Sequence, residues 1–110
     1  MATVNILDVA VEDIVERIDY VRTRWGDAVA DLAYSELMDK LSLLETQPRM
    51  GKLVPELANL GIKTFRLIVH APHTKVLYEL DEDADTIHIH MVFSSNQDFQ
   101  TLLYKRLMRL

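Results

Sequence analysis

The sequence predicts an α+β fold: an N-terminal helical hairpin packs on one face of an antiparallel β-sheet, and a C-terminal helix follows the sheet. Two observations lead to this prediction. Apolar residues recur at helical spacing through residues 8–47, and they alternate with period two through residues 62–93. A helical hairpin and an antiparallel meander each have an apolar face, and packing these faces together gives a two-layer sandwich. A chain of 110 residues has the length of one domain, so we expect residues 1–110 to form a single unit.

The helical hairpin is predicted from two apolar stripes separated by Gly26. After a short strand at residues 3–7, the first helix is expected to begin with Asp8 as its N-cap and to end near Trp25. The second helix follows at once and ends before Pro48, because the residue before a proline disfavours helical backbone. Helices joined by so short a connection must fold back on each other, so the two form an antiparallel pair.

The sheet is predicted from the change of periodicity after a loop at residues 47–61. We expect three short strands at residues 62–69, 75–80 and 86–93. Consecutive strands joined by tight turns form an antiparallel meander. A final helix, capped by Ser95 or Asn96, is expected to run to the C-terminus with its basic side chains in solvent.

Composition excludes several classes of protein. The chain has 17 acidic and 12 basic side chains, a formal net charge of −5, and no cysteine, which excludes disulfides and thiolate metal sites. No apolar run is long enough to cross a membrane and no secretion signal is present, so we expect a cytoplasmic protein. Residues 1–46 carry ten acidic and four basic side chains (net −6), whereas residues 47–110 carry seven and eight (net +1). This distribution excludes nucleic-acid binding by the whole surface but permits a local cationic patch.

The sequence contains no nucleophile elbow, no zinc-protease helix motif and no glycine-rich phosphate loop. His88 and His90 share one face of a strand, but most metal sites need at least three convergent ligands. The acidic run at residues 81–85 lacks the spacing and the glycine of a calcium loop, and we expect it to be a solvated turn. We therefore expect no metal and no cofactor.

Three short segments carry a family resemblance: Pro48-Arg49-Met50-Gly51, Phe65-Arg66-Leu67 and Val76-Leu77-Tyr78-Glu79-Leu80. With these segments in this order, the chain resembles the RelE/ParE superfamily, the toxin halves of type II toxin–antitoxin modules, which include plasmid stabilisation proteins. The resemblance covers most of the chain. It implies a growth inhibitor that a cognate antitoxin neutralises.

The superfamily has two modes of action. One class cleaves mRNA on the ribosome in a basic cleft, for which the resemblance offers Arg66, Lys75 and Tyr78 in this chain. That class has arginines after its last strand, where this chain has the uncharged segment Ser94–Gln97. The other class, ParE, poisons DNA gyrase by protein contact and needs no catalytic residue, so the sequence favours a ParE-like inhibitor over an endoribonuclease. A non-toxic binding module with the toxin fold is a third possibility.

Two sets of surface residues are expected to contact partners. Those expected to contact the target are cations of the second half of the chain: Arg49, Lys52, Arg66, Lys105, Arg106 and Arg109. The alternative is that they keep the solvent-exposed face of the sheet soluble or, in the last helix, interact favourably with the helix dipole. Those expected to contact the antitoxin are partly exposed apolar side chains: Trp25, Leu53, Val54 and Leu60. For Trp25 the alternative is a core position at the corner between the two helices.

Overall fold

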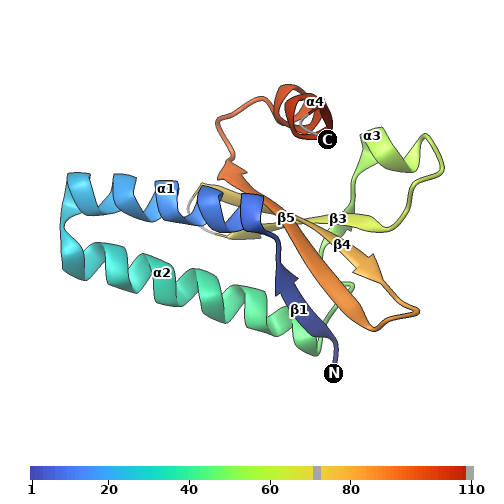
Figure 1. The fold of residues 1–110 in the computed structure, drawn as a ribbon, viewed down its shortest axis with the longest axis horizontal. Coiled ribbons are helices and arrows are strands. Elements are labelled where there is room, and N and C mark those ends of the chain that lie inside the picture. Colours follow the sequence, from blue (N-terminus) through green and yellow to red (C-terminus); the bar gives the residue numbers. More distant parts are fainter. Residues whose placement is uncertain (71–72, 109–110) are drawn as a thin grey trace.

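The computed structural model describes residues 1–70 and 73–108. In chain order its elements are β1 (Thr3–Ile6), α1 (Asp8–Trp25), α2 (Asp27–Ser42), the 3₁₀ turn η1 (Leu43–Glu45), β2 (Lys52–Leu53), α3 (Pro55–Ala58), β3 (Phe65–His70), β4 (Thr74–Asp81), β5 (Thr86–Ser94) and α4 (Phe99–Met108). Figure 1 shows the hairpin α1–α2 on one side of the sheet and α4 on the other. The predicted α+β fold, with a helical hairpin, a sheet and a C-terminal helix, is confirmed.

The strands form one open sheet in the order β1-β5-β4-β3-β2. Strands β3, β4 and β5 form the predicted antiparallel meander, and β2 pairs antiparallel with β3. Strand β1 instead runs parallel to β5, with Thr3 opposite Thr86. The sheet is therefore mixed. Side-chain alternation identifies a strand but does not set its direction, so the parallel edge could not be predicted from the pattern.

Gly26 makes the tight connection between α1 and α2. Its φ of 90° is one that residues with a Cβ atom rarely adopt, and its amide donates to the carbonyl oxygen of Arg22 at 2.9 Å. The predicted role of Gly26 at the end of the first helix is confirmed. The main core lies between the hairpin and the sheet, and its buried residues include Ala10, Ile14, Leu37, Leu41, Leu44, Ile68, Val76, Tyr78, Ile87 and Ile89.

Alternate residues of β4 and β5 point to the opposite face of the sheet. A second, smaller core lies on this face: it contains Val54, Leu77, Met91 and Phe93, with Phe99, Leu102 and Leu103 of α4 packed against it. The rings of Phe93 and Phe99 stack with their centroids 5.4 Å apart. Helix α4 thus covers part of the face that the hairpin leaves open.

Helix α4 begins later than the sequence suggested, and the expected caps are wrong. Asp98, not Ser95 or Asn96, caps it: the Asp98 carboxylate accepts from the Thr101 hydroxyl at 2.8 Å and from the Gln100 amide at 3.1 Å. The hydroxyl and amide side chains of residues 94–97 instead shape the turn before the helix, where the Ser94 amide donates to Gln97 Oε1 at 2.9 Å. An aspartate closer to the apolar stripe was the better capping candidate.

Two further boundaries differ from expectation. The segment at residues 47–61, expected to be a loop, contains β2 and the short helix α3, which begins with Pro55 in a position that suits the fixed φ of proline. Leu7, not Asp8, precedes α1, and Asp8 lies in its first turn. Within residues 1–70 and 73–108, no helix combines the length and apolar character needed to cross a membrane.

Candidate functional site

Tyr78 ties the loop after the helical hairpin to the centre of the sheet. Its side chain is fully buried, and its hydroxyl donates to the carbonyl oxygen of Pro48 at 2.8 Å and accepts from the amide of Gly51 at 2.9 Å. Burial raises the pKa of Tyr78, although the Gly51 amide and the Arg66 charge act in the opposite direction. The hydroxyl is therefore neutral, fully engaged with backbone and inaccessible to a substrate.

Gly51 lies where this loop approaches the sheet most closely. A Cβ atom here would lie 2.8 Å from the carbonyl oxygen of Leu67 and from Cε1 and the hydroxyl of Tyr78, so a side chain does not fit without a shift of the loop. Arg66 adds a further link, since its Nη1 donates to the carbonyl oxygen of Gly51 at 2.7 Å and to that of Arg49 at 3.5 Å. The loop at residues 48–51 is thus fixed from both β3 and β4.

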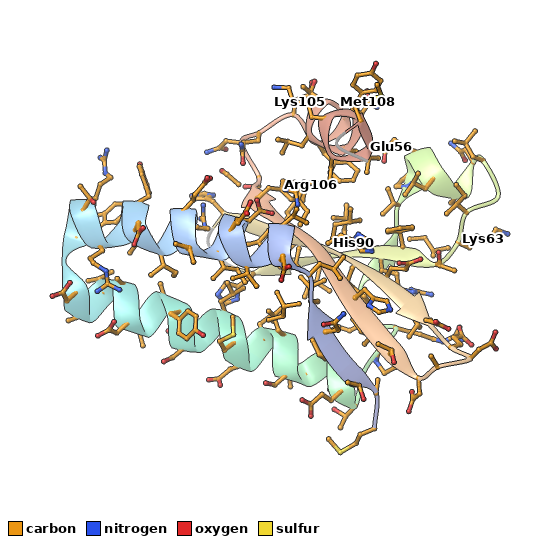
Figure 2. All side chains as sticks on the ribbon, in the orientation of Figure 1. Glu56, Lys63, His90, Lys105, Arg106 and Met108 are labelled. Carbon is orange, nitrogen blue, oxygen red and sulfur yellow. The ribbon has the colours of Figure 1, made fainter. Side chains whose placement is uncertain are left out.

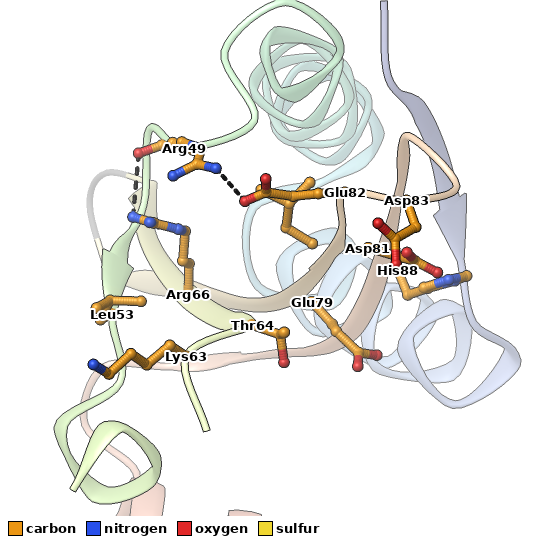
Figure 3. Close-up of a pocket in the computed structure, with 11 residues that line it drawn as sticks. Arg49, Leu53, Lys63, Thr64, Arg66, Glu79, Asp81, Glu82, Asp83 and His88 are labelled. Atoms are coloured by element: carbon orange, nitrogen blue, oxygen red, sulfur yellow. Dashed lines mark hydrogen bonds and ion pairs between the residues drawn. The ribbon is translucent and has the colours of Figure 1, made fainter. Parts of the chain in front are cut away.

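A cleft of about 620 Å³ opens beside this loop, where β3 begins and β4 ends. Figure 3 shows how its walls meet: Arg49 forms an ion pair with Glu82 of the turn after β4, and Arg66 turns its guanidinium toward the backbone of Arg49. Lys63 lies on the same side of the cleft as Arg66, beyond Leu53. The two arginines are therefore engaged with the protein itself.

The charges of the cleft nearly cancel. Three cations line it, Arg49, Lys63 and Arg66, together with four carboxylates, Glu79, Asp81, Glu82 and Asp83. A site that stabilises the charge developing on a phosphate needs an excess of cations directed at that charge. Four carboxylates around the same space oppose an approaching phosphate, so this cleft does not fit a nucleic-acid backbone.

The residues offered for a nuclease do not form one cluster. Arg66 lies opposite Tyr78 in the β3–β4 ladder, and both belong to the sheet face that carries the hairpin. Lys75 lies on β4 three positions before Tyr78 and pairs with Val69 of β3, so its side chain belongs to the other face of the sheet. The sheet therefore separates Lys75 from the other two residues.

The cations expected to contact a target lie in different environments. Arg49, Lys52 and Lys105 are exposed, but Lys105 lies on α4, away from the cleft (Figure 2). Arg106 was expected to stay in solvent, and this is wrong: both of its Asp13 contacts are 2.9 Å long, and the two side chains are only 19% and 18% exposed. Its Nη1 also donates to the carbonyl oxygen of His90 at 2.8 Å. Arg109 lies outside the described residues.

The apolar residues expected to contact an antitoxin are not one patch. Val54 is 1% exposed and belongs to the second core, so its predicted partial exposure is wrong: the residue follows β2 and turns under α3. Leu53, in the edge strand β2, and Leu60, which follows α3, are exposed. Trp25 is 56% exposed, which excludes the alternative of a core position. It lies at the turn between α1 and α2, on the opposite side of the molecule from α3 (Figure 1).

A cluster at the end of the helical hairpin was missed by the sequence analysis. The rings of Tyr20 and Trp25 meet edge to face with centroids 6.1 Å apart, and the guanidinium carbon of Arg24 lies 5.6 Å and 5.4 Å from these two centroids. The i, i+4 spacing of Tyr20 and Arg24 on one helix was the available signal.

The rings of two histidines of β5 contact neighbouring polar side chains. His90 Nε2 lies 3.0 Å from Glu79 Oε1, and His88 Nδ1 lies 3.2 Å from Asn5 Nδ2. Over the part of the chain that the structure describes, no three or more His, Asp and Glu side chains are grouped so that they could hold a metal ion.

Comparison with known proteins gives a family and a fold. The family model described as the ParE toxin of the type II toxin–antitoxin system parDE matches residues 4–99. The isolated E. coli RelE toxin is 14% identical with a TM-score of 0.58, and the alignment covers 97% of this chain and 99% of that chain. No curated protein sequence matches.

Two further solved structures are similar. The RelE toxin with two arginines replaced by alanine, in the free state, is 15% identical with a TM-score of 0.61, covering 99% of this chain and 97% of that chain. A chain of the intact E. coli RelBE toxin–antitoxin complex is 14% identical with a TM-score of 0.57, covering 88% of this chain and 100% of that chain. At these identities the likeness shows a shared fold.

Proposed function

This chain belongs to the ParE toxin family of type II toxin–antitoxin systems, and from that premise we propose that it arrests growth by binding DNA gyrase and not by cleaving mRNA. The observation that carries the proposal is the state of its cations. Arg49 is paired with Glu82, Arg66 is bound to backbone carbonyls, and Arg106 is paired with Asp13.

The two aromatic residues considered for proton transfer in RNA cleavage, Tyr78 and Phe99, are not suited to that role. Attack by a ribose hydroxyl on the adjacent phosphate needs a group that accepts the proton within hydrogen-bonding reach. The Tyr78 hydroxyl is buried, and it already donates one hydrogen bond and accepts another. Phe99, after the last strand, has no side-chain group that exchanges a proton. Inhibition by protein contact requires neither a cation cluster nor a proton acceptor.

The experiment combines induction of the toxin with two direct assays. We expect growth arrest on induction, inhibition of supercoiling by purified bacterial DNA gyrase, and an SOS response. Codon-positioned mRNA cleavage without DNA damage would overturn the proposal in favour of a RelE-type endoribonuclease. Normal growth with folded protein present would favour a non-toxic binding module.

Lys75→Ala tests whether Lys75 takes part in RNA cleavage. Lys75 is a nuclease candidate whose removal should leave the loop at residues 48–51 in place, since its side chain lies on the face of β4 away from the Tyr78–Gly51 contact. We expect this variant to arrest growth as the wild type does. Loss of arrest with unchanged thermal stability would favour the nuclease.

The proposal includes a cognate antitoxin, because the RelBE structure shows a protein of this fold in complex with its antitoxin. We place one antitoxin contact at Leu53 and Leu60, exposed apolar side chains in β2 and directly after α3. Leu60→Glu should weaken antitoxin binding at least tenfold, the loss of one interface anchor, and leave growth arrest intact. Unchanged antitoxin affinity would remove Leu60 from the interface.

A further inference from the structure

The helical hairpin has a groove between its two helices on the side away from the sheet, here called the outer groove. Among the residues that the structure describes, only those of α1 and α2 line it: Val15 and Ile18 lie on one side and Tyr34 on the other. Its volume is about 470 Å³. Val15 is 52% exposed and Tyr34 47% exposed, so the groove is open to solvent. A contiguous exposed apolar surface of this kind is typical of an interaction site.

The apolar residues of the outer groove continue along both helices. Val11, Val15 and Ile18 follow one another at i, i+4 and i+7 on α1, and Tyr34 and Met38 lie four residues apart on α2. The ridge of a third helix fits into a groove between two packed helices, and its anchoring side chains recur at this same spacing. An extended segment would instead need an unpaired strand edge for its backbone groups. The shape therefore favours a helix as the occupant.

Acidic side chains border the outer groove on both sides. Two exposed stripes, one on each helix, carry six carboxylates: Asp8, Glu12 and Asp19 on α1, and Asp27, Asp31 and Asp39 on α2. The stripe on α1 includes Val15 and the stripe on α2 includes Ser35, so both run along the groove. One cation, Arg22, lies between them, with Nη1 2.9 Å from Asp27 and 3.7 Å from Asp31. The six carboxylates and the one guanidinium leave this face with a net charge of −5.

The other three cations of the hairpin lie on its opposite flank. Arg17 lines the groove that α1 and α2 form with the turn between β3 and β4. The guanidinium of Arg24 lies against two aromatic rings of that same groove, and Lys40 follows Glu36 of that groove by one helical turn. The hairpin thus keeps six of its nine carboxylates beside the outer groove and three of its four cations away from it.

The charge of the outer groove decides among occupants. A second copy of this chain would bring its own carboxylates against these, and nucleic acid and anionic membranes carry phosphates that they repel. A helix with apolar residues on one face and Lys or Arg on its flanks complements both the groove and its border. We infer that the outer groove binds a cationic amphipathic helix of a partner protein. The inference is independent of the toxin's target, because the outer groove shares no residue with the cleft or with Leu53 and Leu60.

The test begins with a defined probe, a synthetic helix of about 14 residues that spans about 21 Å, with leucine along one face and lysine on its flanks. Fluorescence anisotropy gives its affinity for the full chain, and chemical-shift changes of the backbone amides locate it. We expect a micromolar Kd and shifts centred on Val15 and Tyr34. Two matched peptides, one with glutamate in place of lysine and one with the leucines distributed around the helix, should each bind about tenfold more weakly or not at all.

Matched variants test the apolar anchors. Val15→Asn/Tyr34→Asn should weaken binding of the probe about tenfold, as for loss of an interface anchor. The control Val29→Asn/Tyr20→Asn replaces the same two residue types, at similar exposure, in the groove on the opposite flank. It should bind the probe like the wild type. All four residues are exposed, so both proteins should keep the wild-type Tm.

A second pair of variants tests the acidic border with equal change in net charge. Glu12→Gln/Asp39→Asn should weaken binding several-fold and reduce its dependence on salt. Glu16→Gln/Glu36→Gln removes two carboxylates that line other grooves and should bind like the wild type. Equal weakening by both pairs would mean that the probe responds only to the overall charge, and would overturn the inference. Equal binding of the glutamate peptide, or shifts centred on another surface, would also overturn it.

Photocrosslinking in cells tests the occupant itself. With a photocrosslinking amino acid at position 15, we expect the crosslinked peptide to come from a partner helix with Lys or Arg beside its apolar face. A crosslink to a second copy of this chain or to an acidic or extended segment would overturn the inference, and so would a yield no higher than from position 29. None of these measurements uses gyrase activity or mRNA cleavage, so failure of the proposed target and failure of this inference are distinguishable.

Discussion

Tyr78→Phe tests whether the buried hydroxyl fixes the loop after the helical hairpin. The substitution removes one oxygen and leaves the ring in place, so packing in the main core is conserved. It breaks the hydrogen bond to the Pro48 carbonyl oxygen (2.8 Å) and the one from the Gly51 amide (2.9 Å). Because the Gly51 amide contact is buried, water does not replace the lost partner without opening the loop.

The expected loss of stability follows from these two contacts. A net hydrogen bond contributes about 0.5–1.5 kcal/mol, so two amount to about 2 kcal/mol. A chain of 110 residues has an unfolding entropy of about 0.23 kcal/mol/K near its midpoint, and ~2 kcal/mol therefore lowers the Tm by about 9 °C. Circular dichroism during heating and urea titration measure the two quantities independently.

Tyr104→Phe is the control, since Tyr104 is an exposed tyrosine of α4 and its hydroxyl can be replaced by water. Its Tm should match that of the wild type. A fall of less than about 2 °C for Tyr78→Phe would mean that the hydroxyl contributes well under 1 kcal/mol. The loop would then be held by Arg66 and by packing, and the account of Tyr78 as its anchor would be refuted.

The same hydroxyl predicts a loss of stability at alkaline pH. Burial raises the pKa of Tyr78 in the folded protein above its ordinary value of about 10. The folded state therefore holds this proton more tightly than the unfolded state, so the contribution is constant below pH ~10 and is lost as the pH rises toward the folded pKa. Tyr78→Phe should show a smaller decline over that range. An identical decline in both proteins would assign it to other groups.

Three further predictions concern contacts that fix the fold. Gly51→Ala should destabilise by about 1–3 kcal/mol, measured by urea unfolding, because its Cβ would lie 2.8 Å from three atoms; a neutral effect would show that the loop moves freely. Arg106→Ala should lower the free energy of unfolding by about 2–3 kcal/mol because it leaves a largely buried Asp13 carboxylate without its guanidinium. A double-mutant cycle with Asp13→Ala should give a favourable coupling energy, whereas additive effects would exclude a direct interaction. The Thr101 hydroxyl lowers the pKa of Asp98, so α4 should lose helicity as the pH falls below the ordinary carboxylate pKa. Hydrogen exchange of the α4 amides measures this loss, and Asp98→Asn should reduce its dependence on pH.

The elements with strong periodicity could be predicted from the sequence. Both helices of the hairpin, the three strands of the meander and the turn at Gly26 follow from apolar spacing and from one glycine, because each depends on neighbours within a few residues. Strand β1 was predicted as an element but not in its pairing. Its partner β5 lies about eighty residues later in the chain, and no local pattern encodes that distance.

The candidate site was less predictable because its contacts join distant segments. Arg106 looked like a solvent-exposed cation of a helix end, yet its partner Asp13 lies 93 residues away on a helix whose outer face is acidic. Val54 looked like part of an exposed loop, but a proline-initiated helix directly after it turns the residue into the second core. In both cases the local composition favoured solvent, and tertiary packing decided otherwise.

The segments that carry the family resemblance meet at one place in the structure, and this explains why the resemblance identifies a fold more sharply than an activity. The first segment supplies Pro48 and Gly51, the second supplies Arg66, and the third supplies Tyr78; the four residues are joined by three hydrogen bonds of 2.7–2.9 Å between side chain and backbone. Every one of these groups is occupied in fixing the loop to the sheet. A sequence pattern selected by such contacts would persist whether the toxin cleaves RNA or binds a protein, so the mode of action must be sought in residues outside the pattern.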